Sequence, residues 1–200
     1  MSDHARSGSL IDATASHSSV APAIRVAGVV LAVSLTAAAA QVSVTLPFTP
    51  VPFVLTPLAV LLCAAALGSR LGTAAQIAYL AAGVVGLPVF APSAVLPPGA
   101  LRLIGPTGGY LMAYHVAAFV TGFLAERGWD RRYVTSVVAM LAGLAIIFAG
   151  GVSWLSFTVT HSFGGALTAG LRWFIALDVL KVVAAAMILP KAWALVGRPR

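Results

Sequence analysis

Long runs of apolar residues, separated by short polar or proline-rich connections, dominate the chain from residue 26 onward. A helix needs about 20 apolar residues, within a range of about 17–25, to cross the hydrocarbon core of a bilayer. We therefore predict six transmembrane helices. They comprise residues 26–44, 53–69, 72–89, 107–125, 133–156 and 172–195. The second and third are short and contain proline or glycine, so a tilted or partly re-entrant helix is an alternative to a full crossing.

The first 24 residues differ from the rest, because they are rich in serine, alanine and histidine and show no apolar period. This pattern predicts a flexible cytoplasmic tail over residues 1–24, followed by one transmembrane domain over residues 25–197. A cleaved signal peptide is the alternative, since Arg25 precedes an apolar stretch that reaches a run of alanines at residues 37–40. We favour a membrane helix because the apolar stretch continues to Val44 and the preceding tail is long for a signal peptide.

Composition strengthens the assignment to a membrane. Of the 200 residues, 60% are hydrophobic and 8% are charged, whereas an ordinary soluble domain has about 25% charged residues. Five acids and twelve bases cannot cover the surface of a soluble chain of this size. A disordered chain and a soluble enzyme are excluded, and the predicted class is an all-α integral membrane protein. We expect no nucleic-acid binding despite the net charge of +7, because no run of Lys and Arg is interleaved with aromatic residues.

The distribution of bases predicts the orientation, because cytoplasmic loops of membrane proteins carry an excess of Lys and Arg. One side of the predicted topology holds nine bases: Arg6, Arg25, Arg70, Arg127, Arg131, Arg132, Lys191, Arg198 and Arg200. The other side holds only Arg102 and Arg172. We therefore predict that both termini are cytoplasmic. The proline- and glycine-rich connections after the first, third and fifth helices then face outward.

Two charged residues of opposite sign, Asp178 and Lys181, interrupt the last apolar segment. A charge at a helix centre costs about 2.5–3.5 kcal/mol on insertion scales, so such residues usually face a cavity. Spaced three residues apart, the two side chains share one face of the helix. The alternative is an ion pair that merely neutralises itself, but a buried pair adds little stability, and we favour a functional role. Together they offer an acceptor and a donor that match a neutral ligand with adjacent N–H and C=O groups, such as a cyclic urea.

The connection before the predicted fourth helix offers a second candidate. It ends in the sequence Gly105–Leu111, in which Thr107 and Gly108 open the helix. Glycine lets another group approach the backbone N–H donors closely, and a helix N-terminus favours a nearby anion. Arg102 lies just upstream and could bind either a ligand carboxylate or a lipid phosphate.

A stripe of small residues marks the predicted first helix at intervals of four: Gly28, Ala32, Thr36 and Ala40. Such a stripe lets another helix approach closely. The spacing leaves open whether that helix belongs to the same chain or to a partner.

Several common kinds of site are not expected. The lone cysteine, Cys63, excludes a disulfide framework and a zinc site within the chain, and we expect neither a metal nor a cofactor. Neither Lys181 nor Lys191 lies in a G-x-x-x-x-G-K-[ST] loop, so ATP-driven work would need another subunit.

Three ordered motifs resemble those of BioY proteins, the biotin-binding S components of energy-coupling-factor (ECF) transporters. The first is Pro47–Pro52 with Leu58–Leu62 behind it, the second is Tyr79–Phe90 and the third is Gly105–Leu111. Asp178 and Lys181 fall where such proteins have their D-x-x-K pair. The resemblance covers about residues 25–195.

The resemblance implies a six-helix S-component bundle in a prokaryotic cell membrane that takes up biotin and performs no chemistry on it. The expected substrate-binding residues are Asp178, Lys181, Tyr79, Thr107, Gly108, Tyr110 and Arg102. The expected gate over the site includes Pro47, Thr49, Pro50 and Pro52. The small-residue stripe would dock on a transmembrane T component, which couples to two ATP-binding-cassette ATPases. Self-association stays open.

The chain also departs from the family pattern. The family often reads G-x-x-P-F-x-P-G-D before the lysine, whereas this chain has Trp173, Ala176 and Leu177 in place of two prolines and a glycine. The last helix could therefore begin earlier.

Two rival functions remain. An S component for another vitamin, such as thiamine or riboflavin, would differ only in the lining of its pocket. An intramembrane serine protease would need Ser153 within hydrogen-bond reach of His115 or His161. The protease hypothesis leaves the intramembrane charges unexplained.

Overall fold

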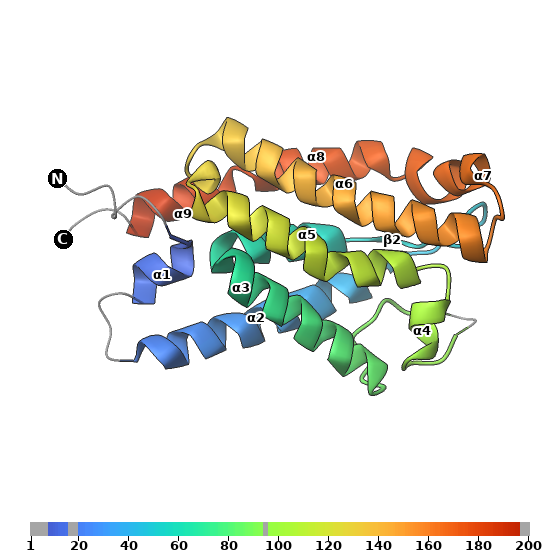
Figure 1. Ribbon diagram of the computed structural model, residues 1–200, viewed down its shortest axis with the longest axis horizontal. Coiled ribbons are helices and arrows are strands. Elements are labelled where there is room, and N and C mark those ends of the chain that lie inside the picture. The colour runs from blue at the N-terminus through green and yellow to red at the C-terminus, as the bar shows by residue number, and fades with distance from the viewer. Residues whose placement is uncertain (1–7, 16–19, 94–95, 197–200) are drawn as a thin grey trace.

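The computed structural model describes residues 8–15, 20–93 and 96–196. Its helices in these ranges are α1 (Leu10–Ala15), α2 (Ala21–Gln41), α3 (Thr56–Val84), α4 (Leu101–Ile104), α5 (Gly108–Glu126), α6 (Tyr133–Thr158), α7 (Phe163–Leu167), α8 (Ile175–Ala185) and α9 (Ile188–Val196). A 3₁₀ turn, η2 (Trp129–Arg131), joins α5 to α6, and a π-helical segment, η3 (Thr168–Arg172), leads toward α8. The strands β1 (Ser43–Val44) and β2 (Phe53–Val54) form a short antiparallel hairpin. Figure 1 shows α1 and α9 at one end of the bundle and α4 and α7 at the other.

The described residues contain five helical stretches that are long and apolar enough to cross a membrane, namely α2, α3, α5, α6 and residues 175–196. These spans confirm the prediction of an all-α membrane protein. The second and third predicted helices overlap the single helix α3, which begins three residues after the predicted start at residue 53 and ends five residues before the predicted end at residue 89. The number of crossings and the side on which the termini lie remain predictions.

The helix α3 consists of two helices joined at Gly68, where the backbone leaves the helical region with φ 83° and ψ 177°. Eight residues of continuous helix would separate Ala64 from Gly72 by about 12 Å. Instead, a Cβ atom placed on Gly72 would lie 2.9 Å from the Cα atom of Ala64. The chain therefore folds back on itself, as Figure 1 shows. The predicted boundary between the second and third helices lies at this reversal.

The reversal is held by α5. The carboxylate of Glu126 accepts hydrogen bonds from the backbone N–H of Ser69 at 2.7 Å and from its hydroxyl at 2.9 Å. This satisfies a backbone donor that a helix start leaves without an intrahelical partner. A Cβ atom on Gly122 would collide with the backbone of Gly68 and Ser69. Glycine at position 122 thus lets α5 touch the turn directly.

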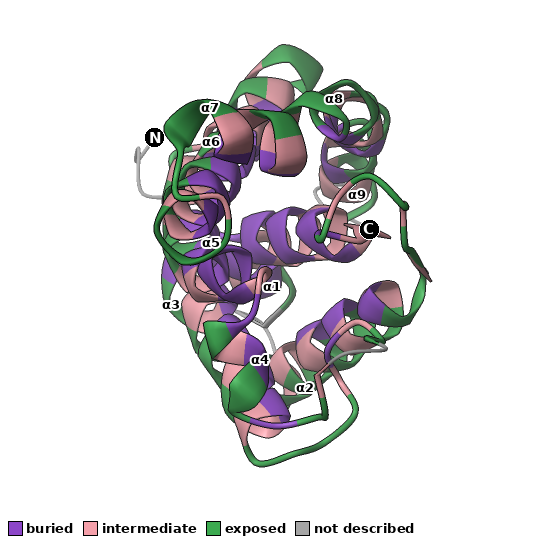
Figure 2. Cartoon of the chain, turned by 90° about the vertical axis from the view of Figure 1, so that its right-hand side faces the viewer, coloured by how far each residue is buried: buried purple, intermediate pink, exposed green. Residues whose placement is uncertain are grey.

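The core lies between the faces of α3, α5, α6 and α8 that point inward, and Figure 2 shows the buried residues on those faces. Small residues bring α5 and α6 together, because Cβ atoms on Gly109 and Gly150 would each meet the backbone of the opposite helix. Close packing of this kind is typical of membrane helices, where van der Waals contact replaces the hydrophobic effect as the force between helices.

The predicted flexible tail has to be corrected for residues 8–15 and 20–24. Residues 10–15 form α1, in which the Ile11 side chain is 8% exposed and packs against Leu67 and Ala75. Asp12 also forms an ion pair with Arg25 at 3.0 Å. The two adjacent apolar residues Leu10 and Ile11 in a polar stretch show no helical period, so the pattern missed α1. The rest of the tail, residues 1–7 and 16–19, lies outside the described residues.

The small-residue stripe also needs correction as a docking surface. Ala32, Thr36 and Ala40 are between 0% and 2% exposed, and a Cβ atom on Gly28 would collide with the Ile11 side chain. Gln76 of α3 donates a hydrogen bond of 3.4 Å to the Thr36 hydroxyl. The stripe therefore packs against α1 and α3 of the same chain and offers no free face to a partner.

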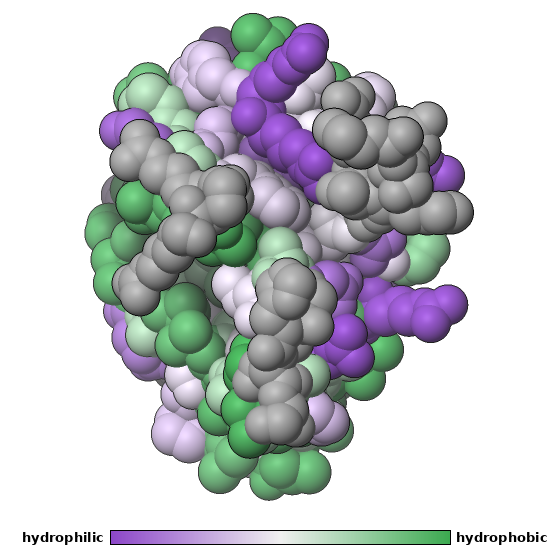
Figure 3. Space-filling model, turned by 90° about the vertical axis from the view of Figure 1, so that its left-hand side faces the viewer, coloured by the Kyte–Doolittle hydropathy of each residue, from purple (hydrophilic) through white to green (hydrophobic). Residues whose placement is uncertain are grey.

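The described bases separate between the two ends of the bundle. Figure 3 shows hydrophilic side chains on the end that carries α1 and α9. The bases in the elements at this end are Arg25, Arg70, Arg127, Arg131, Arg132 and Lys191. Arg102 in α4 and Arg172 in η3 belong to the opposite end. Three further predicted inner bases, Arg6, Arg198 and Arg200, lie outside the described residues.

Candidate functional site

A cavity of about 520 Å³ lies at the end of the bundle that carries α4 and the β1–β2 hairpin. This volume is within the range of sites for small organic ligands. Aromatic rings supply much of the wall: Tyr79, Phe90, Tyr110, Tyr114, Phe148 and Phe174. The polar and charged side chains of the lining are Thr45, Thr56, Ser93, Arg102, Thr107 and Asp178. The cavity is thus apolar with a few polar groups, including one acid and one base.

The acid is Asp178 on α8, whose side chain is buried and lines the cavity. One helical turn later, Lys181 forms an ion pair with it. The Lys181 Nζ atom also donates to the backbone carbonyl of Val54 at 3.0 Å and lies 3.9 Å from the centroid of the Phe53 ring. Lys181 therefore sits behind the carboxylate, between α8 and strand β2, and is not among the residues that line the cavity. Of the predicted pair, the carboxylate is the group that lines the cavity.

Two predicted tyrosines line the wall and fix neighbouring segments. The hydroxyl of Tyr79 donates to the carbonyl of Val89 at 3.1 Å, and that of Tyr110 donates to the carbonyl of Gly170 at 2.7 Å. A Cβ atom on Gly170 would collide with the Tyr110 hydroxyl, so this contact requires glycine. Because both hydroxyl protons are already used, a ligand would meet these residues mainly through their rings and oxygen lone pairs.

At the start of α5, one residue lines the cavity and the next packs against neighbouring helices. Thr107 lines the cavity, whereas Gly108 does not. A Cβ atom on Gly108 would collide with the carbonyl of Leu103 and lie 3.1 Å from the indole nitrogen of Trp154. That indole nitrogen donates to the carbonyl of Gly105 at 2.9 Å. Gly108 thus allows α4, α5 and α6 to meet, and its place in the binding set stays a prediction.

Arg102 supplies the base of the cavity. Its side chain is 9% exposed, and its guanidinium donates to the carbonyls of Pro97 at 3.2 Å and Ala91 at 2.9 Å. Burial lowers the pKa of this guanidinium, but an arginine remains charged at neutral pH. A guanidinium has five N–H donors, so donors remain for an anionic group of a ligand.

The predicted gate borders the cavity and is bonded to the segment before α8. The Thr49 hydroxyl donates to the carbonyl of Ala169 at 2.7 Å and accepts from the backbone N–H of Val51 at 3.1 Å. The ring of Phe48 contacts that of Trp173, with centroids 4.9 Å apart. Pro50 and Pro52 line the cavity, whereas Pro47, the fourth predicted residue of the gate, is exposed and does not.

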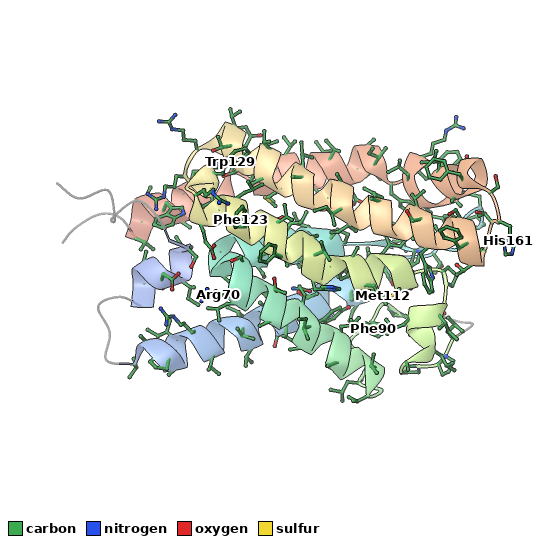
Figure 4. All side chains as sticks on the ribbon, in the orientation of Figure 1. Arg70, Phe90, Met112, Phe123, Trp129 and His161 are labelled. Carbon is green, nitrogen blue, oxygen red and sulfur yellow. The ribbon has the colours of Figure 1, made fainter. Side chains whose placement is uncertain are left out.

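Sequence reasoning missed part of the lining. Tyr114, which is 4% exposed, lines the cavity but is not among the predicted substrate-binding residues. Its position four residues after Tyr110 on one face of α5 was the signal that could have placed it in the site. Phe148 and Phe174 had no such signal, because they come from separate elements. Phe90 ends the second family motif, but no role was predicted for it. Figure 4 shows Phe90 between the ribbons of α3 and α4.

The residues of the protease hypothesis do not enter this site. Ser153 is exposed on α6, and neither it nor His115 or His161 lines the cavity. Figure 4 shows His161 at the extreme end of the molecule. Among the described residues, no group of three or more His, Cys, Asp and Glu could hold a metal ion.

Membrane-spanning helices that enclose an apolar cavity, with one acid of a buried ion pair facing it, define a membrane protein that accommodates a small molecule. The fold matches a crystal structure of the S component for biotin from an ECF-type ABC transporter, with a TM-score of 0.80 and 23% identity. The match covers 91% of this chain and 95% of the other. The chain therefore has the S-component fold.

The family follows from sequence comparison. The model of the BioY family matches residues 13–198, and the chain belongs to this family. It is 41% identical over 145 residues to the biotin transporter BioY of Thermotoga maritima, covering 72% of this chain and 82% of that protein. It is 38% identical over 160 residues to the probable biotin transporter BioY of Pyrococcus horikoshii, covering 80% of this chain and 90% of that protein.

Proposed function

We propose that this chain binds biotin and mediates its uptake as the substrate-specific subunit of an ECF-type importer. The observation that carries the proposal is the Asp178 carboxylate in the cavity, backed by Lys181. The head of biotin is a cyclic urea, whose N–H groups are suitable donors to a carboxylate. A neutral urea can pair with this carboxylate without adding a second charge to the low-dielectric interior. Relatives named as biotin transporters support the same ligand.

The remaining lining suits the rest of the molecule. The rings of Phe90, Phe148 and Phe174 offer an apolar wall to the sulfur-containing ring and the aliphatic chain of biotin. The free donors of Arg102 suit the terminal carboxylate, because arginine binds carboxylates with paired hydrogen bonds. The acid and the base of the cavity thus correspond to the two polar ends of biotin.

In the proposed importer, a transmembrane T component and two ATP-binding-cassette ATPases drive the transport, and this chain has no enzymatic activity and needs no cofactor. Its location is the cell membrane of a prokaryote. The docking face for the T component lies outside the buried stripe of α2. The opposite face of α2, with Val30 and Leu31 58% and 59% exposed, remains open to lipid or to a partner.

Equilibrium binding of labelled biotin to the purified chain tests this function. We expect saturable binding that excess unlabelled biotin abolishes and that thiamine and riboflavin leave unchanged. Competition by thiamine or riboflavin would instead identify an S component for that vitamin. Failure of all three to bind would contradict a vitamin-binding role.

Substitution of Arg102 by Gln is expected to weaken the binding of biotin about 10-fold or more, because a hydrogen bond to a charged group contributes about 1.5–3 kcal/mol. The methyl ester of biotin has no carboxylate, so its affinity should change much less in R102Q. The matched control is Arg172→Gln, which alters an exposed base at the same end of the bundle. Equal losses for biotin and its ester would place the carboxylate away from Arg102.

Substitution of Thr49 by Val removes the hydroxyl that joins the gate to Ala169. We expect biotin to dissociate about 2- to 12-fold faster from T49V, since one neutral hydrogen bond contributes about 0.5–1.5 kcal/mol. A chase of bound labelled biotin with unlabelled biotin measures this rate. Thr158→Val is the control, because its hydroxyl bonds only within α6. A dissociation rate equal in T49V and T158V would remove the Thr49 bond from the control of release.

A further inference from the structure

The outer face of α5 carries exposed aromatic side chains near one end of the bundle. Phe119 and Phe123 are 47% and 39% exposed, and their rings stack with centroids 6.0 Å apart. Val116, 44% exposed, continues this apolar stripe one turn further along the helix. Since α5 is one of the candidate membrane spans, acyl chains are the natural neighbours of these rings.

A positively charged group ends this stripe. Arg127 follows α5 directly, and its guanidinium carbon lies 3.3 Å from the centroid of the Phe123 ring. Stacking of an arginine on an aromatic face is attractive and orients the planar guanidinium. The face therefore presents an apolar surface and, at its end, a fixed cation.

The acids near this arginine are already engaged elsewhere. Glu126 directs both carboxylate oxygens to Ser69. Asp130 is 1% exposed and accepts a hydrogen bond of 2.5 Å from Trp193, and burial raises the pKa of its carboxyl. No ion pair joins Arg127 to an acid among the residues that the structure describes. Its charge is left for an external anion.

A second arginine lies nearby. Arg70 is exposed and follows Ser69, whose backbone N–H bonds to the carboxylate next to Arg127. Figure 4 shows Arg70 and Phe123 at the same end of the bundle. Neither arginine has a carboxylate partner in the described part of the chain, so both raise the positive potential at this position.

We propose that this face binds one anionic phospholipid, with its phosphate at Arg127 and an acyl chain along Phe123 and Phe119. The order of groups along the helix, apolar rings followed by a guanidinium, matches the order of tail and headgroup in such a lipid. Guanidinium groups form strong paired hydrogen bonds with phosphate oxygens. The site therefore selects an anionic lipid through the charge of Arg127 and through the apolar stripe that precedes it on α5.

Native mass spectrometry of the purified full-length chain with added dioleoylphosphatidylglycerol tests the site. We expect a first phosphatidylglycerol to bind with higher affinity than phosphatidylcholine. Arg127→Gln should weaken that first binding about fivefold, in line with about 1 kcal/mol per base near a membrane surface. Phe123→Leu, which keeps the charge and removes the ring under Arg127, should cause a smaller loss. The matched control Arg132→Gln removes an exposed base of the same loop and should retain the parent affinity.

Each alternative has its own outcome. Equal losses in R127Q and R132Q would show diffuse attraction to a basic surface and overturn a defined site, as would unchanged lipid affinity in R127Q. Competition by soluble glycerol 3-phosphate at the affinity of the lipid would show a free phosphate site without a role for the rings. Normal lipid binding in R127Q together with lost assembly into a transporter complex would assign the face to a protein partner. The thermal unfolding of R127Q in phosphatidylcholine alone serves as the check on folding.

Discussion

Replacement of Asp178 by Asn is expected to weaken biotin binding about 30-fold or more, which corresponds to about 2 kcal/mol. The carboxylate accepts hydrogen bonds from a urea with either oxygen, whereas an asparagine presents one acceptor and a competing NH₂ group. The substitution also leaves the Lys181 ammonium without its counter-charge in a buried position. Uncompensated buried charge is costly, so the loss combines a weaker contact with a reorganised pocket.

Replacement of Lys181 by Met should cause a loss of similar size through a different route. Lys181 neutralises Asp178 and also donates to the carbonyl of Val54 in strand β2, which directly follows the gate. K181M should therefore accelerate the dissociation of biotin more than D178N does. The double variant D178N/K181M should lose less than the sum of the two single losses, because residues in one ion pair are energetically coupled.

Isothermal titration calorimetry and the chase of labelled biotin measure these affinities and rates. Lys191→Met is the matched control, since it removes a lysine from α9 at the opposite end of the bundle. Parent affinity in both D178N and K181M would remove the pair from the binding site. Additive losses in the double variant would show that the two side chains act independently.

The charged pair was predictable because a charge in an apolar helix is expensive wherever the helix packs. The division of roles within the pair was not predictable. Whether Asp178 or Lys181 reaches the cavity depends on β2, since the Val54 carbonyl and the Phe53 ring draw the ammonium away from the lining. Positions 53 and 54 lie more than a hundred residues earlier in the chain, and no local pattern reveals that contact.

The small-residue stripe shows a related limit. Spacing showed that a helix approaches Ala32 and Thr36 closely, and one does. Its identity as α3 of the same chain depends on the reversal at Gly68, which places residue 76 against Thr36. The docking role failed because an intramolecular partner and an external one leave the same periodicity. The prediction of a flexible tail over residues 1–24 failed because α1 leaves no periodicity in the sequence. This helix is held largely by one buried residue, Ile11.

Because so much depends on that reversal, Gly68→Ala is expected to destabilise the protein strongly. The backbone at Gly68 has φ 83° and ψ 177°, a conformation that is open almost exclusively to glycine and costs about 1–3 kcal/mol for other residues. The added Cβ atom would also lie 2.5 Å from a carboxylate oxygen of Glu126 and 3.0 Å from the Cβ atom of Ser9. The substitution would therefore disturb the hydrogen bonds from Ser69 to Glu126, which contribute about 1.5–3 kcal/mol as bonds to a charged acceptor.

Comparison with Gly86→Ala separates the cost of backbone strain from the cost of the collision with Glu126. Gly86 also has a positive φ, 99°, but a Cβ atom there would meet nothing within 4 Å. G86A should thus show only the cost of backbone strain, and G68A should unfold at a clearly lower temperature than G86A when both are heated in the same detergent. Pro57 lies in the half of α3 before the turn and Tyr79 in the half after it, and both residues line the cavity. G68A should therefore also lose biotin affinity, whereas G86A should retain it. Equal unfolding temperatures for the two variants would mean that Glu126 does not hold the turn, and that the fold-back of α3 is maintained by the packing of its helices alone.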